Sequence, residues 1–427
     1  MGCSKNLCDS EVLMGKLEAA GYVCHHDPKT PSAPVLIINT CGFIGDAKEE
    51  SINTILVQAQ RKVARRNRLE KLFVIGCLSQ RYMEELKGEL PEVDAWFGKF
   101  DFLGVLDKLV ELGGLEKSES DFRRKLITPQ HYAYLKISEG CNRMCSYCAI
   151  PFITGRHQSR PMDEILDEVR WLSQQGVKEI NVIAQDLSSY GLDIAHKHLL
   201  PELIDKMADI AGIEWIRLHY AYPTDFPDEL LDVMARRANV CKYLDIALQH
   251  CTDHMLSLMR RHITQAEQDA LIHRIRERVP GICIRTTLMV GHPGETEEDF
   301  EALKAWTRTM RFDRLGAFAY SDEEGTYANL HYQDDVPEEV KQRRLSELMD
   351  IQQEISGQLM AEKVGKQMRV IIDRKEGEWY IGRTEFDSPE VDCEVLIPAG
   401  DRELNIGEFN TIKITKAEEF DLYGELC

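Results

Sequence analysis

The chain has 427 residues, of which 43% are hydrophobic and 29% charged, a composition typical of a soluble protein with two or three domains. No apolar run approaches the roughly 18 residues that a membrane helix needs, so we expect a cytoplasmic protein without a membrane span. The net charge of −20 disfavours contact with phosphate backbones, including DNA, and favours a basic partner.

The chain contains 13 cysteines. In a large chain without secretory features, they favour metal ligation and buried thiols over a disulfide framework. Seven of them show no ligand spacing and are expected to be packing residues, namely Cys8, Cys24, Cys241, Cys251, Cys283, Cys393 and Cys427.

Residues 1–115 alternate between predicted strands and helices. The runs 35–38 and 72–75 are apolar at every position, which is typical of buried parallel strands in an α/β domain. Cys41 and Cys77 follow these runs, at the strand ends where open α/β sheets place ligands, and Cys3 begins a similar loop. The three thiols could converge on a metal cluster or could be ordinary buried cysteines at loop starts. Spacing alone leaves both possibilities open.

Two stretches in this part of the chain are strongly charged. The basic run 61–68 is expected to be a solvated helix face rather than a nucleic-acid contact. Residues 116–130 are charged and show no clear period, so we interpret them as a linker.

Residues 131–362 repeat a strand-then-helix pattern six times, which suits an open (β/α)6 barrel with its site at the carboxyl ends of the strands. The predicted strands are 134–137, 179–183, 215–218, 243–246, 284–288 and 315–318, and a helix is predicted over 162–174.

The loop after the first of these strands carries Cys141, Cys145 and Cys148. This spacing can wrap three thiolates around one cubic iron-sulfur cluster and leaves one iron without a protein ligand. An open iron is a position for substrate or cofactor, so the loop predicts chemistry. Packing of three buried cysteines is the less favoured alternative.

This loop resembles the C-x3-C-aromatic-x-C signature of the radical S-adenosylmethionine (SAM) superfamily, with Tyr147 as the aromatic residue. The resemblance implies a 4Fe-4S cluster that binds SAM and generates a 5'-deoxyadenosyl radical. It also implies that Tyr147, Gln185 and Asp186 contact SAM, with the acidic motif at 184–186 meeting its amino group. Arg285, on the fifth predicted strand, could contact the SAM carboxylate. No catalytic side chain beyond the cluster ligands is expected.

The segment 289–296 has glycines that allow a close backbone approach, but it lacks the Gly-Lys-Ser/Thr of a phosphate loop. Thr296 and Asp299 also match a helix N-cap signal, which is a purely structural alternative. His219, His250 and His292 lack metal-ligand spacing and are expected to be hydrogen-bonded lining residues.

Residues 1–11, 39–44 and 76–82 resemble the three cysteine loops of the methylthiotransferase group within the radical SAM enzymes. The resemblance implies that Cys3, Cys41 and Cys77 are ligands of an auxiliary 4Fe-4S cluster. Two 4Fe-4S clusters and SAM are therefore the expected cofactors.

Residues 363–427 contain short predicted strands at 370–372, 379–383, 391–397 and 411–414, as in a small β-barrel. The segment resembles the TRAM domain, an OB-like module best known for binding RNA. Residues 364–427 nevertheless carry 8 basic and 15 acidic residues, which argues against a grip on tRNA.

Two methylthiotransferase families differ in their substrate, and this chain could belong to either. One modifies an aspartate of ribosomal protein uS12 in the small subunit, and the other modifies an adenosine of tRNA. The Lys5-Asn6 opening and the segment 319–326 resemble the first family. We therefore expect β-methylthiolation of a uS12 aspartate, with a low-potential electron donor such as a flavodoxin. A non-catalytic iron-sulfur electron carrier or RNA-binding adaptor is a remote alternative.

Overall fold

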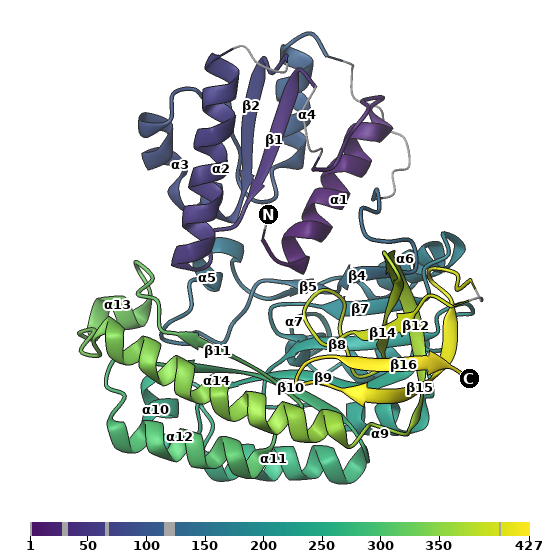
Figure 1. The fold of residues 1–427 in the computed structure, drawn as a ribbon. Helices are drawn as coiled ribbons and strands as arrows, with labels where there is room; N and C mark the ends of the chain where they lie inside the picture. The colour runs from purple at the N-terminus through teal and green to yellow at the C-terminus, as the bar shows by residue number, and fades with distance from the viewer. Residues whose placement is uncertain (1, 28–32, 65–67, 115–123, 401–402) are drawn as a thin grey trace. The chain divides into compact units, whose positions relative to one another are not determined.

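The computed structural model describes residues 2–27, 33–64, 68–114, 124–400 and 403–427 (Figure 1). They form two compact units, one of residues 1–128 with 149–156 and one of residues 129–148 with 157–427. The predicted linker 116–130 falls largely outside the described residues, as does the centre of the basic run 61–68.

The first unit contains a three-stranded parallel sheet in the order β1-β2-β3. Its strands are β1 (Val35–Thr40), β2 (Lys71–Gly76) and β3 (Ala95–Trp96). Its helices are α1 (Ser4–Ala19), α2 (Gly45–Val63), α3 (Cys77–Glu89), α4 (Phe102–Glu111) and α5 (Ile150–Thr154). Both predicted strands are confirmed.

Residues 72–75 of β2 are all apolar because both faces of the sheet are covered. Phe73 and Ile75 pack in a cluster with residues of α1 and α4, whereas Leu72 and Val74 pack with residues of α2 and α3. Successive side chains of a strand point to opposite faces, so helices on both sides require an uninterrupted apolar run. The result is a three-layer α/β domain.

The second unit contains a six-stranded parallel sheet in the order β4-β7-β8-β9-β10-β11. Its strands are β4 (Tyr132–Lys136), β7 (Glu179–Ile183), β8 (Trp215–Ala221), β9 (Val240–Gln249), β10 (Cys283–Val290) and β11 (Arg314–Ala319). All six predicted strands are confirmed. Because the strands follow each other in sequence order, each crossover returns to the same side, as in an open barrel.

The crossovers contain α6 (Met162–Gln174), α8 (Leu200–Met207), α9 (Glu229–Arg236), α11 (Gln265–Arg278) and α12 (Glu297–Met310), and α14 (Glu338–Ala361) follows β11. Shorter elements are β5 (Ser138–Glu139), β6 (Gln158–Ser159), η1 (Leu187–Ser189), α7 (Leu192–Ala195), α10 (Asp253–Leu258) and α13 (Tyr327–His331). Thr296 and Asp299 form a capping box at the start of α12, so the structural alternative for this pair is correct. No helix within the described ranges has the length and apolar character needed to cross a membrane.

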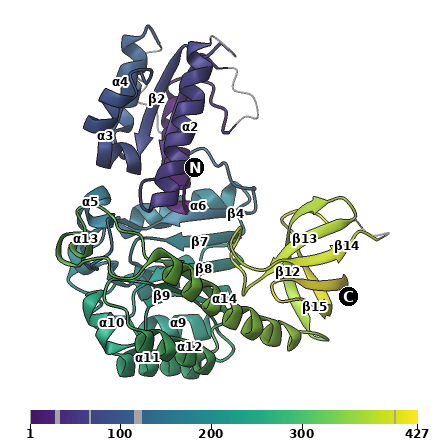
Figure 2. The same ribbon diagram turned by 60° about the vertical axis from the view of Figure 1, so that its left-hand side comes forward.

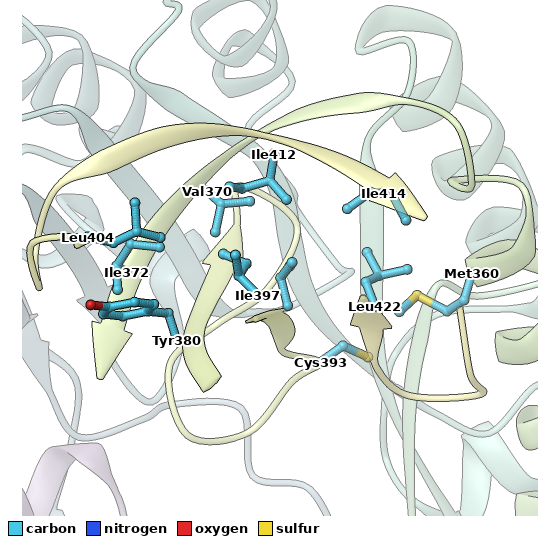
Figure 3. Packing of buried hydrophobic residues seen from close by; sticks show 11 residues of the cluster. Met360, Val370, Ile372, Tyr380, Cys393, Ile397, Leu404, Ile412, Ile414 and Leu422 are labelled. Atoms are coloured by element: carbon cyan, nitrogen blue, oxygen red, sulfur yellow. The ribbon is translucent and has the colours of Figure 1, made fainter. Parts of the chain in front are cut away.

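The C-terminal segment forms a closed five-stranded barrel in the order β12-β13-β14-β16-β15. Its strands are β12 (Gln367–Glu376), β13 (Trp379–Thr384), β14 (Val395–Pro398), β15 (Phe409–Ala417) and β16 (Leu422–Leu426). Inward side chains such as Val370, Ile397 and Ile412 fill its core (Figure 3). The expected small β-barrel is confirmed.

Two details of this barrel differ from the prediction. Strand β14 begins at Val395 rather than Val391, because Asp392 instead bonds Tyr243 and the backbone N–H of Ser388. Strand β16 was not predicted, because Gly424 interrupts its apolar pattern. A Cβ on Gly424 would lie 2.4 Å from the Ile412 side chain, so packing excludes a larger residue there.

The small barrel lies against the starts of the strands of the central sheet, next to the end of α14 (Figure 2). Its segment 383–393 supplies partners to buried groups at those strand starts. Arg217 of β8 donates to the carbonyl oxygen of Glu385 at 2.6 Å, and Arg314 of β11 donates to Asp387 at 2.6 Å. The carboxyl ends of the strands remain available for a site.

Candidate active site

The loop with Cys141, Cys145 and Cys148 follows β4 and β5, at the carboxyl end of the first strand of the sheet. Gly140 enters it with φ of +75°, and Met144 adopts φ of +48°, a left-handed conformation that is uncommon for a residue with a side chain. This curvature lets the chain turn between Cys141 and Cys145. The structure therefore gives the cysteine segment the shape of a wrapped loop.

Neighbouring segments hold this loop in place through Ser146. Its N–H donates to the carbonyl of Met259 at 3.0 Å, and its carbonyl accepts from the N–H of Ala328 at 2.7 Å. Its hydroxyl lies 3.0 Å from Nε2 of buried His292. Burial lowers the pKa of His292 to about 4, so the imidazole is neutral at neutral pH. His292 is thus the hydrogen-bonded lining residue that we expected.

Arg261 is a residue of this site that the sequence analysis missed. It is buried, and its Nη1 lies 3.3 Å from the Cys145 sulfur and 3.4 Å from the Tyr147 hydroxyl. Its guanidinium also stands over the ring of Tyr222 at 4.1 Å. The Arg260-Arg261 pair has no spacing that links it to the cysteine loop, so only the fold reveals this contact.

Arg143, within the cysteine loop, contacts Asp186. Its Nε donates to Oδ2 of Asp186 at 2.8 Å, and its guanidinium stands over the ring of Tyr222 at 4.3 Å. The hydroxyl of Ser189 donates to the same carboxylate oxygen at 2.6 Å. Asp186 follows β7, so the loop is tied to the end of the next strand.

Gln185 is also brought to this site, because its side-chain amide donates to Glu139 of β5. Two oxygens nearby are buried and accept no hydrogen bond from any described residue, namely Oε1 of Gln185 and Oδ1 of Asp186. A buried acceptor without a donor is costly, and a ligand with N–H groups can satisfy it. These atoms fit a ligand with an amino group.

Two cations beside the cysteine loop would favour thiolates over neutral thiols. Burial raises the pKa of Cys141 to about 11, so the metal-free thiol is neutral at neutral pH. Positive iron would stabilise the thiolates, as would the neighbouring Arg143 and Arg261. Among the described residues no three His, Cys, Asp or Glu side chains could hold a single metal ion. In a cluster, however, each thiolate can bind a different iron.

Arg285 lies elsewhere. It is the third residue of β10, in the half of the strand nearer its start, and its Nη1 lies 3.7 Å from Asp392 of the small barrel. The Tyr243 hydroxyl donates to the same carboxylate at 2.7 Å. The structure brings Tyr147, Gln185 and Asp186 to the cysteine loop but gives Arg285 a place between the central sheet and the small barrel.

In the first unit, the three candidate cysteines lie near helix starts. Cys3 is the N-cap residue of α1, Cys77 is the first residue of α3, and Cys41 precedes α2 by four residues. Helix N-termini carry unpaired N–H groups and partial positive charge, which favour an anionic ligand. The partial positive charge at these helix starts would stabilise three thiolates.

Close backbone packing brings these loops together. A Cβ on Gly42 would lie 2.6 Å from the backbone nitrogen of Leu78, and one on Gly76 would lie 2.5 Å from the carbonyl oxygen of Thr40. Asn6 donates to that same carbonyl at 2.9 Å and lies 3.6 Å from the Cys77 sulfur. Glycine is required at both positions, because any side chain would separate the two loops.

The thiols of Cys3 and Cys41 lie close enough to Cys77 to act on its pKa. Burial raises the pKa of Cys77 to about 12, and the neighbouring Cys41 and Cys3 raise it further while Lys99 lowers it. Burial likewise raises the pKa of Cys41, with a contribution from Cys3. The structure therefore brings together three cysteines that are far apart in the sequence.

Models of three known families match successive parts of the chain. A model of the radical SAM superfamily matches residues 135–307, a model of the uncharacterized protein family UPF0004 matches residues 1–98, and a TRAM domain model matches residues 364–427. A ribosomal protein uS12 methylthiotransferase RimO from Bacteroides thetaiotaomicron is 61% identical, over all of this chain and 97% of the relative. The chain belongs to the RimO family.

A second RimO protein, from Porphyromonas gingivalis, is 57% identical over all of this chain and 97% of its own length. Membership of the RimO family makes the chain a radical SAM methylthiotransferase and hence a transferase. The remote alternative of a non-catalytic carrier or adaptor is therefore wrong.

A solved structure shares the fold. The radical SAM methyltransferase TsrM from Kitasatospora setae, with cobalamin and a 4Fe-4S cluster bound, superimposes with a TM-score of 0.53 and 17% identity, over 73% of this chain and 71% of that one. The chain thus shares the fold of that enzyme.

Proposed function

We propose that this member of the RimO family transfers a methylthio group to the β-carbon of an aspartate in ribosomal protein uS12, in the cytoplasm. The observation that carries the proposal is identity of 61% over the whole chain to a protein named for this activity. Relatives of this similarity support uS12 over the tRNA alternative.

Cys141, Cys145 and Cys148 would hold a 4Fe-4S cluster with one open iron. With SAM bound and one electron supplied, such a cluster provides a radical that removes hydrogen from an unactivated carbon. Arg261 would donate to the Cys145 sulfur, and Ser146 would keep the loop at its position on the sheet. These residues bind and orient the cofactor rather than exchange protons.

Gln185 and Asp186 would bind the amino group of SAM. Their buried oxygens without donors support this role, and Arg143 holds the Asp186 carboxylate in a fixed orientation. Tyr147, with its hydroxyl bonded by Arg261, would line the same site. A preorganised carboxylate binds a cation at a lower entropic cost than a mobile one.

Cys3, Cys41 and Cys77 would hold a second 4Fe-4S cluster, which would carry the sulfur to be transferred. The convergence of the three cysteines at the starts of α1, α2 and α3 supports this assignment. Three cysteine ligands again leave one iron open, and the sulfur group would bind there.

The charge of the chain supports a protein substrate. The net charge is −20, and residues 364–427 contain 8 basic and 15 acidic residues. Electrostatic complementarity favours encounter with a basic protein and opposes encounter with phosphate. A low-potential electron donor such as a flavodoxin would supply the electron.

The test is incubation of the anaerobically reconstituted enzyme with SAM, a reductant and either uS12 or tRNA. The proposal predicts the methylthio mass on the peptide of uS12 that carries the modified aspartate and none on tRNA. The methylthio mass on tRNA alone would overturn the substrate assignment.

A further inference from the structure

A buried lysine lies beside the cysteines of the first unit. Lys99 follows β3, and its side chain is 3% exposed. Its Nζ lies 3.6 Å from Oδ2 of Asp9 on α1, whose side chain is 4% exposed. Lysine is almost never buried to this extent without a charged partner, because its ammonium group loses hydration. Packing alone therefore does not explain why the ammonium group of Lys99 is buried.

The positive charge acts on the cysteine group. Burial is the main influence on the pKa of Cys77 and raises it, whereas Lys99 is the largest influence that lowers it. Cys41, Cys3 and Asp9 act on the same thiol. The geometry agrees, because Asp9 follows Asn6 by about one turn of α1, and the Asn6 side chain lies 3.6 Å from the Cys77 sulfur. The Lys99–Asp9 pair therefore lies beside the Cys77 loop.

The backbone of Lys99 is fixed to the helix that begins with Cys77. The N–H of Lys99 donates to Oε1 of Gln80 at 3.0 Å, and the hydroxyl of Ser79 donates to the carbonyl of Phe97 at 2.6 Å. A Cβ on Gly98 would lie 2.7 Å from the same Gln80 oxygen, so the segment packs closely on α3. The lysine cannot move away without disrupting the start of α3.

We propose that Lys99, held by Asp9, is a positioning residue that supplies a permanent positive charge to the cluster bound by Cys3, Cys41 and Cys77. This inference depends on the proposed function only in requiring that these cysteines bind a cluster. Three thiolates make the bound cluster anionic, and reduction adds a further negative charge. A nearby buried cation favours the reduced state and raises the reduction potential.

The test uses the full chain in which Cys141→Ala, Cys145→Ala and Cys148→Ala remove the other cluster site. The second cluster is then the only one expected, and its midpoint potential is measured by an anaerobic redox titration followed by electron paramagnetic resonance. Lys99→Met should make the equilibrium constant for one-electron reduction at least ten-fold less favourable, a shift of about 59 mV to more negative potential. Lys99→Arg should keep most of the original potential.

Asp9→Asn provides a test of opposite sign, because it removes a negative charge and leaves Lys99 in place. Its potential should move to a more positive value. Lys87→Met is the matched control, since Lys87 lies on the same helix α3, pairs with Glu84 and is 44% exposed. The control should leave the potential unchanged.

The outcomes separate the two proposals. If the chain with intact Lys99 binds no iron in this background, the second cluster of the proposed function is wrong and this inference falls with it. If Lys99→Met binds iron normally at an unchanged potential, the second cluster stands and the role of Lys99 is wrong. If Lys99→Met fails to fold, the Asp9→Asn titration decides, and an unchanged potential there overturns the inference.

Discussion

Arg383 of the small barrel donates hydrogen bonds to both carboxylate oxygens of Glu179, the first residue of β7, at 3.2 and 2.8 Å. Arg217 of β8 donates to the same carboxylate at 3.0 Å. Burial alone would raise the pKa of Glu179, but the two guanidinium groups outweigh it and hold the pKa below its ordinary value. The charged cluster joins the small barrel to the central sheet.

Arg383→Met should therefore destabilise the protein strongly. It leaves the carboxylate of Glu179 with one cation instead of two, and removal of one partner from a buried ion pair costs about 3–5 kcal/mol of unfolding free energy. Urea unfolding of the metal-free full chain, followed by tryptophan fluorescence, measures the loss.

The matched control for this variant is Arg343→Met on α14. Arg343 pairs with Glu347 and Glu297, but its side chain is 46% exposed. An exposed ion pair contributes about 0–1 kcal/mol, so the control should unfold close to the wild type. Equal losses in the two variants would contradict the structural role of the buried pair.

Acid should reduce the stability of α12 through Asp299. Burial would raise the pKa of this carboxyl, but hydrogen bonds from Thr252, His254 and Thr296 outweigh it and lower the pKa to about 2, from an ordinary value of 3.8. A depressed carboxyl pKa stabilises the fold above the unfolded value. That contribution is lost as the pH falls from about 4 toward about 2.

Asp299→Asn removes this pH dependence. In urea unfolding of the metal-free full chain, the variant should be less stable than the wild type above pH about 4, and the difference should shrink toward pH about 2. Asp167→Asn, at an exposed position of α6, serves as the control. A difference that stays constant over this range would show that Asp299 does not carry the effect.

Asp186→Asn should weaken the binding of SAM. The change removes a negative charge whose free oxygen is proposed to accept from the SAM amino group. Loss of a hydrogen bond between charged groups costs about 1.5–3 kcal/mol, which is roughly a ten- to hundred-fold increase in Kd. Anaerobic calorimetry on the reconstituted enzyme measures the Kd for SAM. Asp205→Asn on helix α8 is the control and should leave this Kd unchanged. An unchanged Kd in the Asp186→Asn variant would remove Asp186 from the SAM site.

The two cysteine groups should separate the two halves of the reaction. With Cys3, Cys41 and Cys77 replaced by alanine, reductive cleavage of SAM to 5'-deoxyadenosine should persist while methylthio transfer to uS12 is abolished. With Cys141, Cys145 and Cys148 replaced, both should be lost. Chromatography of 5'-deoxyadenosine and mass analysis of uS12 give the two readouts. Cys24 is a half-buried cysteine of the first unit, and the Cys24→Ala variant should retain both SAM cleavage and methylthio transfer.

The sequence could predict β1, β2 and the six strands of the central sheet, because each contains a short run of mainly apolar residues. The two-residue strand β3 is too short to give such a run. The sequence could also predict the Cys141 loop, since the ligands lie close together in the chain. The convergence of Cys3, Cys41 and Cys77 required the resemblance, because no local spacing joins residues so far apart. The contacts of Arg143 and Arg261 depend on where loops meet in the fold, which no periodicity encodes.

Arg285 has a partner in the small barrel that the sequence did not predict. The predicted strand 284–288 already placed this residue near its start, whereas ligands bind at the carboxyl ends of such strands. The structure gives it Asp392 as a partner. The sequence predicts a strand over 391–397, but the strand begins at Val395 and Asp392 bonds Tyr243 of the central sheet.

Iron and sulfide quantitation on anaerobically reconstituted protein tests the central claim of two clusters most directly. The wild type should bind about eight irons per chain, and the Cys3→Ala and Cys141→Ala variants should each approach about four. The second cluster would be contradicted if the wild type and the Cys3→Ala variant both bind about four irons and the Cys141→Ala variant binds none.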